Sequence, residues 1–226
     1  MTVQVMPGAS VRPDAELYDF RSPAALAREQ ARALELTFDT FARQWGTQLT
    51  AKLRTVCRIV GGGVSIASYD DVSAGFGDGA ALALVPVGAS AARTVLQLPA
   101  ATLLGWVGRM LGGAGVLPTP QRAFTTVELA IVRHLLDETL EELSYSFGAA
   151  LPPRLVVESV HVTPQVAPAA APTDLMVVTS FRIRLDEVET PATLAIPASV
   201  LLPALGELEE FVGPDENLRR LRAQLA

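Results

Sequence analysis

The chain has 226 residues, of which 50% are hydrophobic and 19% are charged, and its formal net charge is −6. This composition is typical of a folded globular protein and excludes a disordered chain. The acidic balance argues against nucleic-acid binding, and because Lys52 is the only lysine, no P-loop is present to hold a nucleotide.

The first half of the chain predicts a long helix followed by strands. Residues 1–17 have no periodic apolar pattern, so we expect a flexible N-terminal arm. Ser22 and Pro23 are typical of a helix start. The helix that follows carries an apolar stripe with spacings of three or four: Leu34, Phe38, Phe41, Trp45, Leu49 and Leu53. Alternation and turn residues then predict strands over 55–60, 80–87 and 94–98, a bulge or turn at 61–63, and a short helix over 100–111.

The second half repeats this order. Thr125 and Glu128 form a capping-box pattern ahead of a second long helix, which Pro152 and Pro153 end. The remaining pattern predicts strands over 155–162, 175–185 and 193–196, a loop over 164–172, a closing helix over 199–211 and a charged tail over 213–226.

A repeated motif indicates that the two halves arose by duplication. Residues 96–104 return as residues 194–202 with five of nine positions identical. We therefore expect half-repeats at about 22–117 and 122–212. Each half has an amphipathic helix and an apolar sheet face that it cannot bury alone. Pairing the halves predicts a three-layer α/β/α fold of the α+β type, with a largely antiparallel central sheet and helices on both sides.

Residues that could perform catalysis are few. His134 and His161 are too distant in sequence and too few for a metal site, and the chain carries no motif for a cofactor, so neither is expected. Cys57 is the only cysteine, and we interpret it as a small buried hydrophobic residue rather than a reactive thiol. The four carboxylates of the second long helix predict a solvated acidic face, with a docking surface for a basic partner as the alternative: Asp137, Glu138, Glu141 and Glu142.

Three glycines follow the first short helix, at Gly112, Gly113 and Gly115. One glycine suffices to end a helix in the left-handed conformation. The additional glycines favour a loop that turns twice or lets another chain approach its backbone. On this hypothesis, Gly113→Val weakens partner binding and leaves the fold intact, because a β-branched residue resists a left-handed backbone.

The chain shows no membrane-spanning pattern. It begins without a secretory signal, and the uncharged stretch over 190–206 is interrupted by three prolines. We therefore expect a cytoplasmic protein without direct membrane insertion.

Several of these features together resemble the FliM family of flagellar motor switch proteins. The resemblance rests on residues 18–23 (Tyr-Asp-Phe-Arg-Ser-Pro), residues 41–44, the paired Leu-x-Leu/Ile-Pro segments and residues 111–115 (Leu-Gly-Gly-Ala-Gly). It covers residues 18 to about 210 and implies a middle domain, 18–212, with the CheC-like fold.

The resemblance also implies a function. It implies a non-enzymatic component of the rotor switch complex (the C-ring), peripheral to the inner membrane at the flagellar basal body. In that role it would bind FliG through Gly112, Gly113 and Gly115, assemble beside FliM neighbours and FliN, and transmit chemotactic switching. Residues 1–17 show no convincing copy of the family peptide that captures phosphorylated CheY, and the FliN-like domain expected after residue 212 is absent from this sequence.

Two alternatives stay open. A CheC-like phosphatase of phosphorylated CheY would carry Glu-x-x-Asn on its long helices, whereas the only asparagine is Asn217 in the tail. Without that amide the attacking water cannot be oriented by the same mechanism. The other alternative is an interaction domain of a related secretion apparatus.

Overall fold

The computed structural model describes residues 28–113, 122–162 and 169–204. The expected arm over 1–17, the helix start at Ser22 and the tail over 213–226 lie outside these residues, as does Gly115. Within them the elements are α1 (Arg28–Leu53), β1 (Cys57–Ser68), α2 (Tyr69–Ala74), β2 (Ala80–Pro86), β3 (Arg93–Pro99), α3 (Ala100–Met110), α4 (Thr126–Phe147), a 3₁₀ turn (Gly148–Ala150), β4 (Ser159–His161), β5 (Leu175–Leu185) and β6 (Val188–Pro197). Residues 198–204 are helical.

The six strands form one sheet in the order β1-β5-β6-β3-β2-β4. Every neighbouring pair is antiparallel, as predicted. The two halves occupy equivalent places in this order: β1 corresponds to β4 at the opposite edge, β5 corresponds to β2, and β6 corresponds to β3. The two copies of the repeated motif, in β3 and β6, lie side by side at the centre, where Leu96 pairs with Leu194, its own equivalent in the repeat. The sheet therefore confirms the predicted pseudo-two-fold duplication. The first strand of each half pairs with a strand of the other half, β1 with β5 and β4 with β2.

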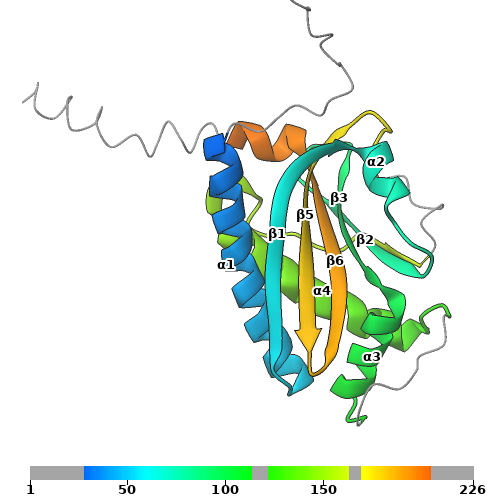
Figure 1. Ribbon diagram of the computed structural model, residues 1–226. Coiled ribbons are helices and arrows are strands. Elements are labelled where there is room, and N and C mark those ends of the chain that lie inside the picture. The colour runs from blue at the N-terminus through cyan, green and yellow to red at the C-terminus, as the bar shows by residue number, and fades with distance from the viewer. Residues whose placement is uncertain (1–27, 114–121, 163–168, 205–226) are drawn as a thin grey trace, which may run out of the picture.

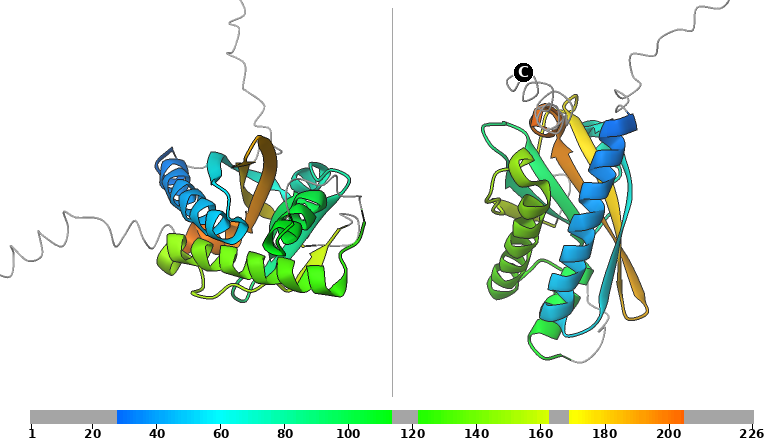
Figure 2. Two further views of the ribbon diagram at one scale, coloured as in Figure 1. Left: turned by 90° about the horizontal axis from the view of Figure 1, so that it is seen from below. Right: turned by 90° about the vertical axis from the view of Figure 1, so that its left-hand side faces the viewer.

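Helices lie on both faces of the sheet, but unevenly (Figures 1 and 2). The large core lies between the sheet and the helices α1, α3 and α4. A smaller core lies on the opposite face, where Tyr69 and Val72 of α2 pack over one end of the sheet. The three-layer prediction is confirmed, with only a short helix in the third layer.

The apolar stripe of α1 is buried as predicted, and aromatic rings join it to its neighbours. Phe38 packs edge-on against Phe147 of α4, with ring centroids 5.0 Å apart. Phe181 of β5 meets Phe41 at 5.5 Å and Trp45 at 5.7 Å. These contacts fix the long helices to each other and to the middle of the sheet.

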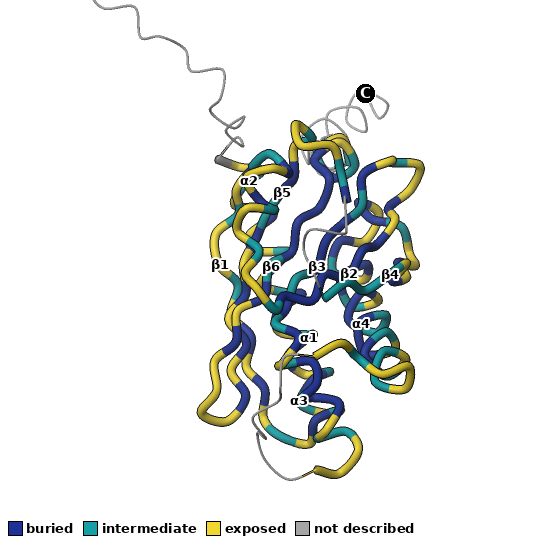
Figure 3. Tube along the Cα trace, turned by 90° about the vertical axis from the view of Figure 1, so that its right-hand side faces the viewer, coloured by how far each residue is buried: buried dark blue, intermediate teal, exposed yellow. Residues whose placement is uncertain are grey.

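Some predicted boundaries were wrong. The first strand does not end at residue 60: β1 continues to Ser68 and absorbs the glycine triplet as a register shift between Gly61 and Val64. The helix α2 was not predicted. Of the strand expected over 155–162, only Ser159–His161 pairs in the sheet, and β6 is longer than expected. Figure 3 shows the buried residues concentrated in the central strands, while the turns between elements are exposed. The end of the closing helix expected over 199–211 lies outside the described residues.

Candidate functional site

The glycine pair at the end of α3 forms a Schellman motif. The N–H of Gly113 donates to the carbonyl of Gly108 at 2.9 Å, and the N–H of Gly112 donates to the carbonyl of Arg109 at 2.9 Å. Gly112 has φ +92°, the left-handed region that favours glycine. This motif ends α3 directly before residue 114, and Gly112 and Gly113 supply both of its backbone hydrogen-bond donors.

Gly113 is required for a different reason from the one expected. Its backbone is not left-handed; instead, a Cβ added there would lie 2.9 Å from the carbonyl oxygen of Gly108. The expectation that one glycine suffices for this helix end was therefore wrong, since the cap uses two. For the same reason, Gly113→Val would strain the end of α3 itself and would not test a partner contact cleanly.

Arg109 holds this helix end against two distant turns. Its guanidinium donates to Thr55 Oγ1, between α1 and β1, at 2.8 Å. It also forms an ion pair with Asp186 Oδ2, in the β5–β6 turn, at 2.5 Å. The Arg109 side chain is only 15% exposed. The end of α3 is thus tied to elements from both halves of the domain, at the lower end of the molecule in Figure 1. The sequence analysis missed this residue because its partners are remote in the chain.

An exposed apolar side chain lies beside the glycines. Leu111 is 70% exposed, and Val127, in the first turn of α4, is 67% exposed. In the sequence, Leu111 comes before residues 114–121 and Val127 comes after them. An exposed leucine next to a rigid backbone turn is suited to anchoring a protein partner.

The start of α4 is fixed by the predicted capping box. Thr125 Oγ1 accepts from the N–H of Glu128, and the Glu128 carboxylate accepts from the N–H of Thr125. The Arg122 guanidinium donates two hydrogen bonds to the same carboxylate, at 2.7 and 2.5 Å. Together the hydrogen bonds from Arg122 and from the Thr125 backbone lower the pKa of Glu128 from 4.5 to about 2. Glu128 is therefore engaged in structure and not available for catalysis.

A polar seam joins α1 to α4. Lys52 Nζ lies 2.6 Å from Glu138 Oε1, and Gln48 Nε2 donates to Glu138 Oε2 at 3.4 Å. Burial acts to raise the pKa of Glu138, but the hydrogen bonds from Lys52 and Gln48 outweigh it and hold the pKa below its usual value. His134 Nε2 reaches the same carboxylate at 3.3 Å.

The predicted acidic face of the second long helix is consequently only partly correct. Glu141 is exposed, but Glu138 belongs to the seam with α1. Asp137 Oδ1 accepts from the backbone N–H of Val157 at 2.8 Å and so holds the segment before β4. These carboxylates serve packing between elements, which helical spacing alone did not indicate.

Cys57 and His161, the other residues considered for chemistry, each have a structural environment. Cys57 is buried, which confirms the interpretation of a small buried hydrophobic residue, and burial raises the pKa of its thiol to about 11. His161 Nε2 lies 2.9 Å from Ser159 Oγ. No group of three or more metal-ligating side chains occurs within residues 28–113, 122–162 and 169–204. In the same part of the chain, no helix is long and apolar enough to cross a membrane.

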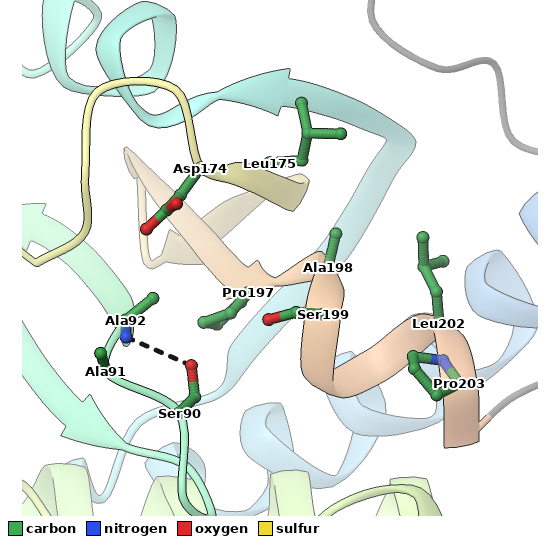
Figure 4. A pocket seen from close by; sticks show the side chains of 10 residues that line it. All are labelled: Ser90, Ala91, Ala92, Asp174, Leu175, Pro197, Ala198, Ser199, Leu202 and Pro203. Atoms are coloured by element: carbon green, nitrogen blue, oxygen red, sulfur yellow. Dashed lines mark hydrogen bonds between the residues drawn. The ribbon is translucent and has the colours of Figure 1, made fainter.

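The sequence analysis also missed an open hollow between the β6 end and the loop before β3. It has a volume of about 610 Å³ and its lining is mainly apolar (Figure 4). Among the described residues that line it, Asp174 alone is charged, and that carboxylate accepts from the N–H of Ala171 at 2.9 Å.

Comparison with known proteins identifies a family for most of the chain. The family model described as "Flagellar motor switch protein FliM" matches residues 27–211. The chain is 25% identical to FliM of Treponema pallidum over 192 residues, covering 85% of this chain and 56% of that protein. It is 22% identical to FliM of Borreliella burgdorferi over 219 residues, covering 93% of this chain and 62% of that protein.

A solved structure shares the fold. The comparison is with a chain of the FliG-FliM complex from H. pylori, at a TM-score of 0.72 and 16% identity over 79% of this chain and 98% of that chain. The chain spans less than two thirds of the length of the curated relatives that it matches. Because the family model covers most of the sequence, from residue 27 to residue 211, the chain belongs to the FliM family of flagellar motor switch proteins.

Proposed function

We propose that this chain is a non-catalytic scaffold of the flagellar rotor switch complex. In this role it binds FliG through the loop at Gly112, Gly113 and Gly115, stands beside neighbouring copies in the C-ring and transmits the change of rotation direction. Family membership over residues 27–211 carries the proposal. A relative of the same fold has been crystallised in a FliG-FliM complex, which supports FliG as the partner.

The geometry at the end of α3 supports this loop as the contact. The Schellman motif gives the backbone one direction, and the exposed side chain of Leu111 stands beside it. Arg109 ties the same helix end to the β5–β6 turn and to the start of β1. A displacement of the loop by FliG would therefore be passed to both halves of the sheet. Switching requires two arrangements of neighbouring subunits that are close in free energy.

The absence of catalysis is part of the proposal. A CheC-like mechanism would use a carboxylate with an asparagine three residues later on α1 and α4, and the glutamates of these helices lack that arrangement. Residue 38, three positions after Glu35, is a buried phenylalanine. Glu128 is held by Arg122, and Glu138 by Lys52. These occupied carboxylates support a scaffold over a phosphatase.

Further partners and the location follow from the same proposal. The unit that acts is the domain over 18–212, with half-repeats at about 22–117 and 122–212. FliN is its further partner in the ring; residues 1–17 show no convincing copy of the family peptide that captures phosphorylated CheY, so binding of that regulator is not part of the proposal. The protein works in the cytoplasm, peripheral to the inner membrane at the flagellar basal body.

The test is calorimetric titration of the full chain with FliG. We expect saturable binding, and Leu111→Asp should abolish or strongly weaken it while leaving the thermal unfolding curve unchanged, because Leu111 is 70% exposed. The matched control is Leu36→Asp, since Leu36 is 62% exposed and belongs to α1, not to α3 or the glycine loop.

Two results would contradict the proposal. Failure of the folded chain to bind FliG would remove the rotor assignment. Equal effects of Leu111→Asp and Leu36→Asp would remove the loop as the contact.

Acceleration of CheY dephosphorylation would establish the phosphatase alternative. Binding to a ring protein of a secretion apparatus in place of FliG would establish the interaction-domain alternative.

A further inference from the structure

One part of the sheet surface carries a cluster of arginines that no described element covers. On β5 the residues Phe181, Ile183 and Leu185 point into the large core, so the alternate residues Arg182 and Arg184 point away from it. On the neighbouring edge strand β1, Arg58 pairs with Arg184 and Val60 pairs with Arg182. We call this surface the arginine face, and it consists of Arg58, Val60, Arg182, Arg184, Glu189 and Pro191.

The positive charges of the arginine face are incompletely neutralised. Arg58 and Arg184 are direct cross-strand partners, an arrangement that destabilises a sheet because like charges then stand about 4.5–5.5 Å apart at their Cβ atoms. Arg182 lies 3.9 Å from Glu189, and Arg184 lies 3.9 Å from Glu187. Glu189 is also the cross-strand partner of Arg184 on β6, and the Arg184 guanidinium donates to the backbone carbonyl of Asp186 at 3.5 Å.

Arg58 is without an acidic partner among the residues that the structure describes. It makes no ion pair or side-chain hydrogen bond with any residue that the structure describes. Three guanidinium groups therefore share one surface with the carboxylates of Glu187 and Glu189, so this surface keeps an excess of positive charge in a chain whose net charge is −6.

The arginine face is also open and partly apolar. The helix α2 covers the other end of this side of the sheet, and in Figure 1 no helix lies in front of the lower parts of β1, β5 and β6. Val60 is 46% exposed between the arginines, and Pro191 is exposed beside Arg182. Arginine mixed with apolar side chains is typical of a protein interface. A nucleic acid would require a larger basic surface than three arginines in an acidic protein.

We propose that the arginine face is a docking site for an acidic protein segment, which contributes carboxylates to the three arginines and an apolar side chain to Val60. The spacing defines the partner further. Arg182 and Arg184 are two residues apart on a strand, so their Cα atoms are separated by about 6.6–6.8 Å. Carboxylates at alternate positions of an extended segment repeat at the same distance, and each then forms a charge-assisted hydrogen bond with one guanidinium. The arginine face contains none of the residues proposed to contact FliG, so the inference does not rest on that contact.

The test uses the full chain and a labelled ten-residue peptide in which glutamate alternates with valine. We expect saturable binding by fluorescence anisotropy at low salt. The double variant Arg182→Glu/Arg184→Glu should weaken binding by at least about tenfold. The matched control is Arg32→Glu/Arg43→Glu, which changes the net charge equally at two exposed arginines of α1. Glu189→Gln should strengthen binding, because it removes the carboxylate that competes for Arg182.

The outcomes separate this site from its alternatives. Equal weakening by the two double variants would overturn the proposal, because the effect would then come from net charge alone. Absence of peptide binding, or preferential binding of phosphatidylserine vesicles or of single-stranded DNA, would overturn it as well. If the glutamate variants do not fold, Arg184→Gln replaces them, and it should still weaken peptide binding. FliG affinity should be unchanged in these variants, so failure here does not bear on the proposed rotor function.

Discussion

The bridge made by Arg109 allows a quantitative prediction. The change is Arg109→Met, which keeps most of the packing of the side-chain stem and removes the guanidinium. The bond to Thr55 Oγ1 and the ion pair with Asp186 are both lost. A hydrogen bond to a charged group contributes about 1.5–3 kcal/mol when well shielded. The Asp186 side chain is 47% exposed, so screening by solvent reduces its share. We expect a total loss of about 2 kcal/mol.

Denaturation experiments measure this loss directly. For a chain of this size, about 2 kcal/mol corresponds to a fall in Tm of about 4–8 °C. Urea unfolding should show a lower midpoint with an unchanged slope. The control is Arg43→Met, because Arg43 donates to Thr40 of its own helix and its loss should change stability by less than about 0.5 kcal/mol.

A double-mutant cycle isolates the ion pair. Combining Arg109→Met with Asp186→Asn should give a coupling energy of about 1 kcal/mol.

The same variant should also affect binding. FliG affinity should fall in Arg109→Met even under conditions where the domain is fully folded, because the end of α3 is no longer held in place. A stability within about 0.5 kcal/mol of the unchanged protein, or no coupling in the cycle, would refute the argument that Arg109 holds the end of α3.

Three further predictions concern the helix ends and the thiol. Gly112→Ala should reduce the free energy of unfolding by about 1–2 kcal/mol, because the φ of Gly112 is +92°. Gly105→Ala inside α3 should not reduce it, since an added Cβ there meets no atom within 4 Å. Urea unfolding compares the two variants. The pKa of Glu128 is lowered in the folded state, so its contribution is present above pH 4.5 and is lost as the pH falls towards about 2. Glu128→Gln should therefore be less stable than the unchanged protein at pH 7, and the difference should disappear in acid; a constant difference across this range would contradict the reasoning. Cys57 should resist iodoacetamide at pH 8 until urea unfolds the chain, because its pKa is about 11; rapid alkylation of the folded protein would show that the thiol is accessible.

The sequence determined the elements that depend on local patterns. The α1 stripe from Leu34 to Leu53 follows from helical spacing, and the capping box of Thr125 and Glu128 follows from two side chains three residues apart. The repeated motif of residues 96–104 and 194–202 indicated the duplication, and the antiparallel sheet followed from the short connections between strands. These properties are local, or are copied from one half to the other, so they can be read along the chain.

Only the tertiary structure decided the contacts between distant residues. The strand β1 continues through its glycine triplet because its partner β5 supplies the hydrogen bonds on both sides of the register shift, which no local propensity encodes. The bridge from Arg109 to Thr55 and Asp186, and the seam from Lys52 to Glu138, join charges that lie far apart in the sequence. The arginine face arises in the same way, because strand pairing brings Arg58 opposite Arg184. Burial and electrostatic energies depend on distance in space, so the role of each of these residues is defined only when the chain has folded.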